Sequence, residues 1–438
     1  MSGRCFTESV SSSPARPDLD DLRVVGLTDL DGDPSTRLDE YIDAVARGFH
    51  ETVSDEDRAL WRSTTQPERA FGVRTGSGAG EKWVATMAAF DRVLTVPGGE
   101  FPIAAVSEVT VAPAYRRRGL LSRMMRQQLE DARDRGEMAA YLWVSEYAIY
   151  GRFGFGEATR RLVLEVDKRR AAFAAHVDLG DGIVDEVDRD VALAVLPGVF
   201  AGLRSRTPGW LDRPGPWWEA ATYDAEGARG GAGPLRFLLH WNAAGEVDGH
   251  AQFRFKEDYG PSGNSSEVRV SQVVAATAQA RARLWRTLLD IDLAPRLRTR
   301  FGGPGEALPW WLADRDAVSE RLMAGTFLRL VDVPGALAAR TYADEVDHVI
   351  EVRDDLLPEN AGRFRLRGGP DGAEVAREDA AEPDISLDVR ELASVYLGGV
   401  GLTDLVATGL VGSGDVRRVD RLDAAMRHHV PAECLDMF

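Results

Sequence analysis

The chain has 438 residues, of which 44% are hydrophobic and 28% charged, and its formal net charge is −17. This length suggests two to four domains, and the composition is that of an ordinary globular protein. The negative charge argues against general nucleic-acid binding, because phosphate contacts require a basic surface. No run of about 18 apolar residues occurs, so the sequence offers no candidate membrane-spanning helix.

Residues 1–21 are rich in Ser, Pro and Asp and lack an apolar core, so we expect a disordered lead-in and no secretory signal. The two cysteines, Cys5 and Cys434, lie near opposite ends of the chain. They provide neither a disulfide framework nor a cysteine-rich metal site, and the histidines show no metal-ligand spacing. We therefore expect a cytoplasmic protein without a bound metal.

The chain divides into three parts, and the first, residues 22–165, mixes helices and strands. The apolar spacing of Arg37–Gly48 favours a helix. Strands are predicted at Glu81–Phe90 and Phe101–Val111, joined by a turn at Gly98-Gly99. The clearest helix is Leu120–Glu137, and a buried strand follows at 141–145.

The second part, residues 166–310, has a similar order. Paired strands are expected at Leu235–His240 and His250–Phe255, then a strand at Glu267–Val274 and a helix at Ala278–Leu289. Because a strand followed by a helix also occurs at 104–136, we infer a degenerate internal repeat. The third part, residues 311–438, has short alternating segments followed by helical pieces, which predicts a small sheet with helices. The fold class is α/β (α+β) with mixed sheets.

The loop at 112–118 carries the most chemical information. It places Arg116, Arg117 and Arg118 at the start of a helix, where positive charge opposes the helix dipole. An anion over the free N–H groups makes the arrangement favourable, and Gly119 lets that anion approach closely. The loop is therefore predicted to hold a pyrophosphate, although a solvated basic turn remains the alternative. It matches neither the triphosphate-binding nor the dinucleotide-binding glycine pattern.

A second motif follows Ser145: Tyr150 and, four residues later, Gly154-Phe155. Together with the run Arg116–Leu121 (RRRGLL), in which Leu121 replaces the usual small residue, this pattern resembles the GNAT superfamily of N-acetyltransferases. More narrowly, 111–121 (VAPAYRRRGLL) and 145–154 (SEYAIYGRFG) resemble the enhanced intracellular survival (Eis) acetyltransferases.

The resemblance implies a catalytic GNAT domain at 22–165, a second GNAT-like domain without a coenzyme site at 166–310, and a sterol-carrier-protein-like domain at 311–438. It implies acetyl-CoA as the donor, an amine of an aminoglycoside-like polycation as the acceptor, and a homohexamer built from trimers. Two rival functions are protein lysine acetylation and a non-enzymatic protein that senses acetyl-CoA or a lipid.

The resemblance also implies residue roles. The backbones of Val109 and Val111 would hold the donor, and the Val111 N–H would polarise its thioester carbonyl. Further donor contacts would come from Arg116, Arg117, Arg118, Gly119, Leu120, Leu121 and Ser145. Tyr150 would act as general acid, although a packed tyrosine is the ordinary alternative.

The C-terminal carboxylate of Phe438 would act as base through a water, although a frayed terminus is the default for chain ends. Substrate contacts are expected from Glu108, which shares a strand face with Thr110, from Trp61, and from Asp436. Met437 stands where the resembled family has an acidic residue, which puts aminoglycoside affinity in question.

The second part provides an internal comparison. Its corresponding loop, 275–280 (AATAQA), has neither an arginine cluster nor a helix-opening glycine, so we expect no coenzyme there. Cys434 is the one candidate nucleophile, and direct transfer in a ternary complex is the favoured mechanism.

Overall fold

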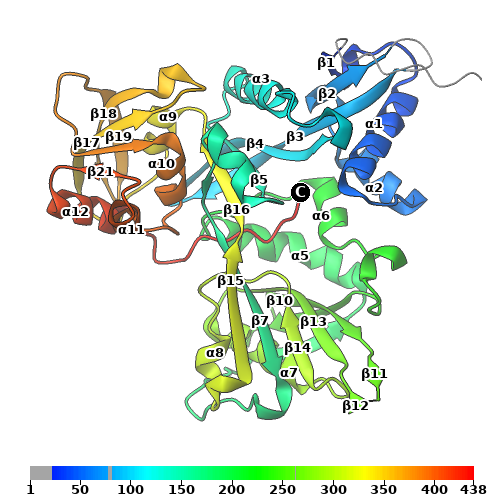
Figure 1. The fold of residues 1–438 in the computed structure, drawn as a ribbon. Helices are drawn as coiled ribbons and strands as arrows, with labels where there is room; N and C mark the ends of the chain where they lie inside the picture. Colours follow the sequence, from blue (N-terminus) through cyan, green and yellow to red (C-terminus); the bar gives the residue numbers. More distant parts are fainter. Residues whose placement is uncertain (1–21, 77–80, 262) are drawn as a thin grey trace, which may run out of the picture.

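The computed structural model describes residues 22–76, 81–261 and 263–438, and forms three lobes (Figure 1). The expected lead-in at 1–21 lies outside the described residues. Two lobes are built on seven-stranded sheets and the third on a five-stranded sheet, so the predicted mixed α/β class is confirmed.

The first sheet has the order β1-β2-β3-β4-β5-β16-β6. The expected hairpin is present, since β3 and β4 pair antiparallel around Gly98, whose φ is +77°. Its strands are β1 (Arg23–Gly26), β2 (Ala70–Thr75), β3 (Lys82–Val96), β4 (Gly99–Val111), β5 (Ala139–Trp143), β6 (Gly156–Glu157) and β16 (Thr326–Leu330).

Helices cover both faces of this sheet. The long amphipathic helix α3 (Leu120–Asp134) buries its apolar stripe, including Met124, Met125 and Leu129, against one face. The helices α1 (Pro34–Phe49) and α2 (Asp55–Thr64) lie on the other face, where Tyr41 packs edge-on against Trp83. Asp33 and Ser54 cap the starts of α1 and α2.

The second sheet has the order β15-β7-β14-β13-β10-β9-β8. The helix α7 (Ala278–Asp290) packs on one face, and α5 (Arg189–Arg204) packs on the other at the β9–β10 end. Its strands are β7 (Arg160–Asp167), β8 (Ile183–Val187), β9 (Arg236–Trp241), β10 (Val247–Lys256), β13 (Glu267–Ala275), β14 (Arg296–Thr299) and β15 (Val318–Ala324). The short helix α6 (Gly215–Ala221) and the hairpin β11–β12 (Tyr259–Gly260, Gly263–Asn264) complete this part.

The boundary expected at residue 310 does not coincide with the observed sheets. The strand β15 belongs to the second sheet, and β16 crosses back into the first sheet between β5 and β6. The chain therefore reaches its third lobe only after residue 330. The periodicity of a sequence does not show which sheet a strand joins, because pairing depends on distant partners.

The third sheet has the order β19-β18-β17-β20-β21. Its strands are β17 (Val346–Arg353), β18 (Gly362–Gly369), β19 (Gly372–Arg377), β20 (Ile385–Asp388) and β21 (Gly412–Ser413). The helices are α9 (Val333–Ala338), α10 (Val389–Tyr396), α11 (Leu402–Ala407) and α12 (Val416–Met426). A small sheet with helices is what the alternating segments predict.

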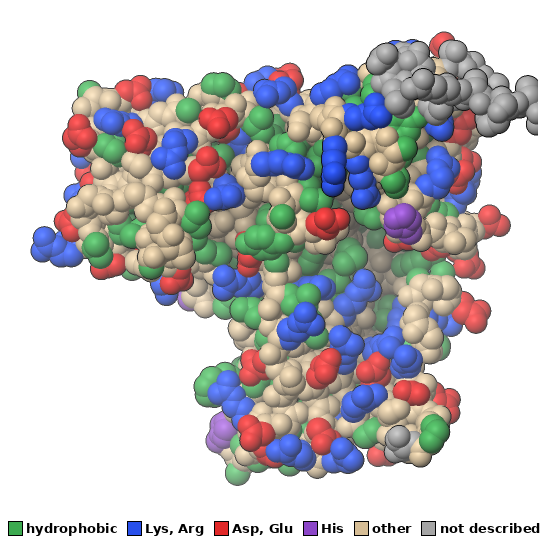
Figure 2. All heavy atoms as spheres, viewed as in Figure 1, with side chains coloured by type: hydrophobic (Ala, Val, Ile, Leu, Met, Phe, Trp, Pro, Cys, Tyr) green, Lys and Arg blue, Asp and Glu red, His purple; other side chains and the backbone are tan. Residues whose placement is uncertain are grey.

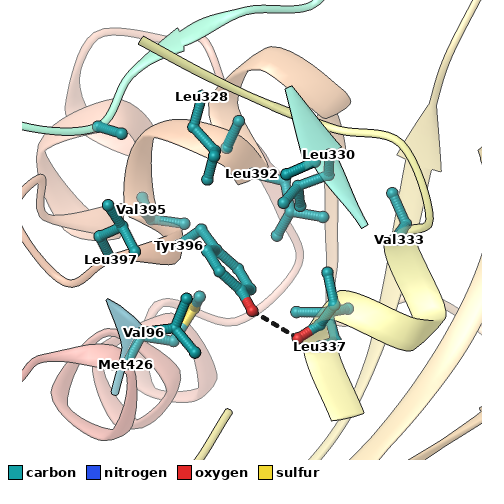
Figure 3. Close-up of a cluster of buried hydrophobic side chains, with 14 of the residues drawn as sticks. Val96, Leu328, Leu330, Val333, Leu337, Leu392, Val395, Tyr396, Leu397 and Met426 are labelled. Carbon is teal, nitrogen blue, oxygen red and sulfur yellow. Dashed lines mark hydrogen bonds between the residues drawn. The ribbon is translucent and has the colours of Figure 1, made fainter. Parts of the chain in front are cut away.

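The first and third lobes share one hydrophobic core. Val96 and Leu328 of the first sheet pack in the same cluster as Leu392 and Tyr396 of α10 (Figure 3). The Tyr396 hydroxyl donates to the Ala336 carbonyl at 2.6 Å, which satisfies its buried polar end. The third lobe is thus fixed to the first, and its last residues start from a defined position.

After α12 the chain runs as an extended tail toward the first sheet, where the C-terminus lies between the first and second lobes (Figure 1). Among the described residues, none of the helices combines the length and apolar character needed to cross a bilayer.

Candidate active site

Strands β4 and β5 diverge at the centre of the first sheet. They pair in parallel only from Ile103–Ala105 to Ala139–Tyr141, although β4 continues to Val111. The Ala112 N–H donates to Val84 of β3, and alternate residues direct their N–H groups to opposite strand edges. The N–H groups of Val109 and Val111 therefore point into the gap beside β5.

A β-bulge sharpens this divergence. Two residues of β4, Glu108 and Val109, lie opposite the single residue Met87, and Glu108 has a φ of +56°. Such bulges bend a strand and interrupt its pairing. Despite the bulge, Thr110 lies on the α1 side, where it is buried and its hydroxyl contacts Thr86 at 2.7 Å.

The gap leads to the start of α3, which no side chain caps. Gly119 adopts a φ of +76° there, and the N–H groups of residues 120–122 have no hydrogen-bond partner among the described residues. Arg116, Arg117 and Arg118 are exposed, and none pairs with a described carboxylate. Arg116 instead donates to the Val111 carbonyl at 3.2 Å. This arrangement combines free N–H donors with unpaired positive charge, and it fits a bound pyrophosphate.

The second lobe contains the matching strand and helix, with a different start. Thr277 accepts from the Ala280 N–H at 3.1 Å and so caps α7 with its own side chain. The contrast between α3 and α7 supports a coenzyme role for α3 alone.

Tyr150 ends the short helix α4 (Tyr147–Tyr150), just after β5. It is 5% exposed and packs edge-on against Phe155 in the α3-side core. Burial, and then the charge of Glu146, raise the pKa of Tyr150 to about 12, against a smaller lowering by the hydroxyl of the exposed Ser145. The phenol is therefore neutral at pH 7 and keeps a proton that it can donate.

The C-terminal residue lies on the other face of β5. The Phe438 ring stacks on Tyr141 with ring centres 6.1 Å apart. The Asp436 carbonyl accepts from the Trp143 indole N–H, which holds the tail along β5. The gap between β4 and β5 is thus flanked by Tyr150 on one side and by the tail on the other.

Asp436 lies in the protein interior rather than on a surface open to a substrate. It is 6% exposed and accepts from Arg213 at 2.6 Å, with Arg92 3.7 Å away. Both arginine side chains are fully buried. The expectation of a substrate contact at Asp436 therefore requires correction, because the carboxylate is paired inside the tail's docking site.

The Glu108 carboxyl is also enclosed. Its Oε1 accepts from Thr65 at 3.3 Å, and its Oε2 is buried without a regular hydrogen bond to a described residue. Burial raises the pKa of Glu108 to about 7, and the neighbouring hydroxyls of Tyr41 and Thr65 oppose this rise. Near neutral pH, Glu108 is thus poised between its charged and uncharged forms.

The other two candidates take structural positions. Trp61 on α2 is half-buried and packs against the cluster around Tyr41, so core packing accounts for it. Cys434 is buried, and burial raises the pKa of its thiol. A buried protonated thiol is a poor nucleophile.

Sequence reasoning missed the residues that hold the tail, Arg92 and Arg213, and the Glu108 neighbour Tyr41. Arg213 lies in the Pro- and Trp-rich run 208–218, just before α6 begins at Gly215. A lone arginine in such a run gives no signal of its partner, since that partner lies 223 residues away.

Comparisons with known proteins place this arrangement in a class. Two families, each described as an acetyltransferase (GNAT) domain, match residues 34–158 and 209–330, and a sterol carrier protein domain family matches residues 333–434. The chain is therefore a GNAT N-acetyltransferase with a second GNAT domain and a sterol-carrier-like domain, and acetyl-CoA is its donor.

Similar proteins of known sequence or structure identify the type of N-acetyltransferase more narrowly. The chain is 40% identical to an uncharacterized N-acetyltransferase of Streptomyces coelicolor, over 81% of this chain and 86% of that protein. It is 35% identical to N-acetyltransferase Eis of Mycobacterium tuberculosis, over 89% and 94% of the two chains. The crystal structure of Eis1 from Mycobacterium abscessus superimposes with a TM-score of 0.78 at 29% identity, covering 95% of this chain and all of that one. The chain belongs to the Eis-type N-acetyltransferases.

The start of α3 yields a test with a built-in control. Gly119 and Gly136 stand at the two ends of α3 with φ of +76° and +75°, and a Cβ at either meets nothing within 4 Å. Alanine at either site carries a similar backbone penalty of about 1–2 kcal/mol. We expect Gly119→Ala to weaken acetyl-CoA binding about tenfold or more, measured by calorimetry, and Gly136→Ala to leave it unchanged. Equal effects would remove the helix start from the donor site.

Glu108 yields a pH prediction. Its folded-state pKa lies above the usual value, so the folded protein holds this proton more tightly, and stability falls as pH rises from about 4.5 to about 7. Glu108→Gln removes this loss. We expect the melting temperature of the variant to gain on wild type between about pH 5 and pH 8. The exposed Glu68, whose carboxyl has no described partner, provides the control Glu68→Gln, which should show no such gain.

Proposed function

We propose that this chain transfers the acetyl group of acetyl-CoA directly to an amine of a small molecule, in a ternary complex without an acyl-enzyme. The observation that carries the proposal is the continuous path from the β4–β5 gap to the uncapped start of α3. The exposed N–H groups and unpaired arginines there suit a pyrophosphate, and the strand edge suits an extended pantetheine arm.

The donor carbonyl requires polarisation. The Val111 N–H points into the gap and is our candidate for the group that stabilises the oxyanion. Val109 would hold the arm two residues earlier on the same edge. The absence of an accessible thiol at Cys434 supports direct attack by the amine.

Tyr150 would donate a hydrogen bond to the departing sulfur. With a pKa of about 12, it cannot give its proton fully to a free thiolate, whose acid has a pKa of about 8.5, except at a cost of about 5 kcal/mol. The proton therefore moves only as the amine nitrogen releases its own. Our expectation of simple acid catalysis is refined in this sense: the phenol stabilises developing charge and relays a proton.

The Phe438 carboxylate would accept, through a water, the proton that the acceptor's ammonium form loses to become the attacking neutral amine. The second nitrogen proton, released after attack, replaces the one that Tyr150 gives to the sulfur. No described cation pairs with this carboxylate, and stacking on Tyr141 fixes its residue. A carboxylate is a much weaker base than an amine, so its contribution is electrostatic as well.

The proposals for the acceptor and for the oligomeric state follow from the family resemblance and from the charge of the chain. The family resemblance points to an aminoglycoside-like polycation, and the overall charge of −17 favours cations at long range. Protein lysine acetylation is the second enzymatic candidate, and a non-catalytic sensor of acetyl-CoA or lipid is the third. We also propose a homohexamer of two trimers and a cytoplasmic location, and sedimentation velocity tests the former.

Kinetics would separate these candidates. Acetyl transfer to small amines, with tobramycin included, is compared with transfer to a panel of lysine peptides. Higher kcat/KM for the peptides would favour the lysine rival. Binding of acetyl-CoA with no transfer to any amine would favour the sensor.

Tyr150→Phe tests the relay. We expect kcat to fall about a hundredfold or more, with little change in acetyl-CoA binding measured by calorimetry. Tyr147→Phe is the control, since Tyr147 lies in the same short helix and is 62% exposed. Equal losses in the two variants would contradict the assignment.

The terminal carboxylate is tested by adding one glycine after Phe438, which moves the carboxylate while retaining every side chain. We expect kcat to fall about tenfold or more. Phe438→Tyr keeps the carboxylate in place and should retain activity. A fully active extended chain would refute the role of the carboxylate.

A further inference from the structure

Basic side chains gather on the second lobe, below the hollow that separates it from the first lobe (Figure 2). The second sheet supplies three arginines, Arg161, Arg254 and Arg300, which are here called the arginine cluster. They come from β7, β10 and the residue that follows β14.

Strand alternation puts the three side chains on the same face. Leu162, Phe253 and Leu297 point into the core under α7, so their neighbours Arg161 and Arg254 point the other way. Arg300 follows the buried Thr299 and points the same way. The backbone N–H of Arg300 donates to the Val270 carbonyl, so residue 300 lies beside β13. β13 in turn pairs with β10, the strand that carries Arg254.

The cluster lacks matching negative charge. Among the described residues, no carboxylate pairs with Arg161 or Arg300, and the Arg161 Nε is buried without a hydrogen-bond partner. Arg254 pairs with Asp224, but that carboxylate also accepts from Arg229. Desolvation, and then the charges of Arg161 and Arg254, lower the pKa of Arg300. Like charges held together at a partly desolvated surface are unfavourable until an anion binds.

The cluster lies beside the catalytic tail. An Arg300 Nη donates to the Met437 sulfur at 3.7 Å, one residue before the proposed terminal base. Phe301 packs edge-on against Trp143 of β5, with ring centres 5.6 Å apart. The pyrophosphate position at α3 is on the opposite face of the first sheet, so the cluster is separate from the donor's phosphates.

From this juxtaposition, and resting on the proposed function, we infer that the arginine cluster binds an anionic group of the acceptor. The preferred acceptor is then a small amine that also carries a carboxylate or a phosphate, which departs from the polycation that the family resemblance suggests and keeps the proposed acetyl transfer. The amine end reaches the tail and the β4–β5 gap, while the anionic end rests on Arg300 and Arg161. Guanidinium groups suit both anions, because they donate in a fixed planar fork.

Matched acceptors test this inference. For each of several chain lengths, kcat/KM is measured for a linear amine whose far end is a methyl, a carboxylate, a phosphate or a second amine. We expect one of the two anionic series to exceed the diamine about tenfold or more, as a charge-assisted hydrogen bond implies. The two anionic arms distinguish a carboxylate from a phosphate. A preference for the diamines or tobramycin would overturn the inference.

Variants locate the effect. Arg300→Gln and Arg161→Gln should each reduce the ratio of anionic to neutral acceptor about tenfold. Arg298→Gln is the control, because Arg298 lies on the same face but is 53% exposed and faces Glu165 at 3.4 Å. If Arg300→Gln leaves the ratio of kcat/KM for anionic and neutral acceptors unchanged, the cluster does not bind the acceptor. A changed sedimentation coefficient in the same variant would then point to contact between copies of the chain.

A binding measurement keeps this test independent of turnover. Calorimetry with the N-acetylated anionic amine, added to the protein with coenzyme A, should give tighter binding than the N-acetylated neutral amine, and Arg300→Gln should remove the difference. If no amine is acetylated yet this difference is found, the proposed function fails and the anion site stands. If amines are acetylated and no difference is found, the anion site fails.

Discussion

One buried carboxylate joins the three lobes of this protein. Asp436, in the tail that follows the third lobe, meets Arg213 from the second lobe and Arg92 from β3 of the first. Both guanidiniums also stack on aromatic rings, Arg92 over Trp217 and Arg213 over Phe200. Removing one partner of such a buried pair leaves an uncompensated charge, which typically costs about 3–5 kcal/mol. This pairing holds the tail in place, and with it the terminal carboxylate that we propose as base.

The exchange of strands between the two GNAT domains also fixes the lobes relative to one another. Because β7 continues into the second sheet and β16 returns to the first, the two sheets are linked by a paired ribbon rather than by a flexible linker. Paired strands resist the relative motion that separate domains allow. The first and second lobes are therefore held in a fixed relative position, with the tail between them.

Arginines without a carboxylate partner among the described residues lie in two separate regions. The chain is strongly acidic overall, yet unpaired arginines lie at two places, the start of α3 and the face of the second sheet near Met437. The first fits the donor's phosphates. The second would select among acceptors, so the net charge by itself gives a poor guide to the substrate.

The amino-acid sequence by itself determined the local features on which the proposed donor site rests. The arginine loop, Gly119 and Tyr150 lie within 35 residues of one another, and the local rules for helix starts and turns apply directly to them. It also determined the strands and helices whose short-range periodicity is clear. The hairpin at Gly98 and the long helix α3 are examples.

Only the tertiary structure decided which distant residues meet. The pairing of Asp436 with Arg213, the place of β16 in the first sheet, the enclosure of Glu108 and the grouping of Arg161, Arg254 and Arg300 all join residues far apart in the chain. Charge partnership and desolvation depend on distances in space, which spacing along a chain does not encode. A carboxylate near the terminus therefore indicated a substrate contact in the sequence, and folding made it an anchor for the tail.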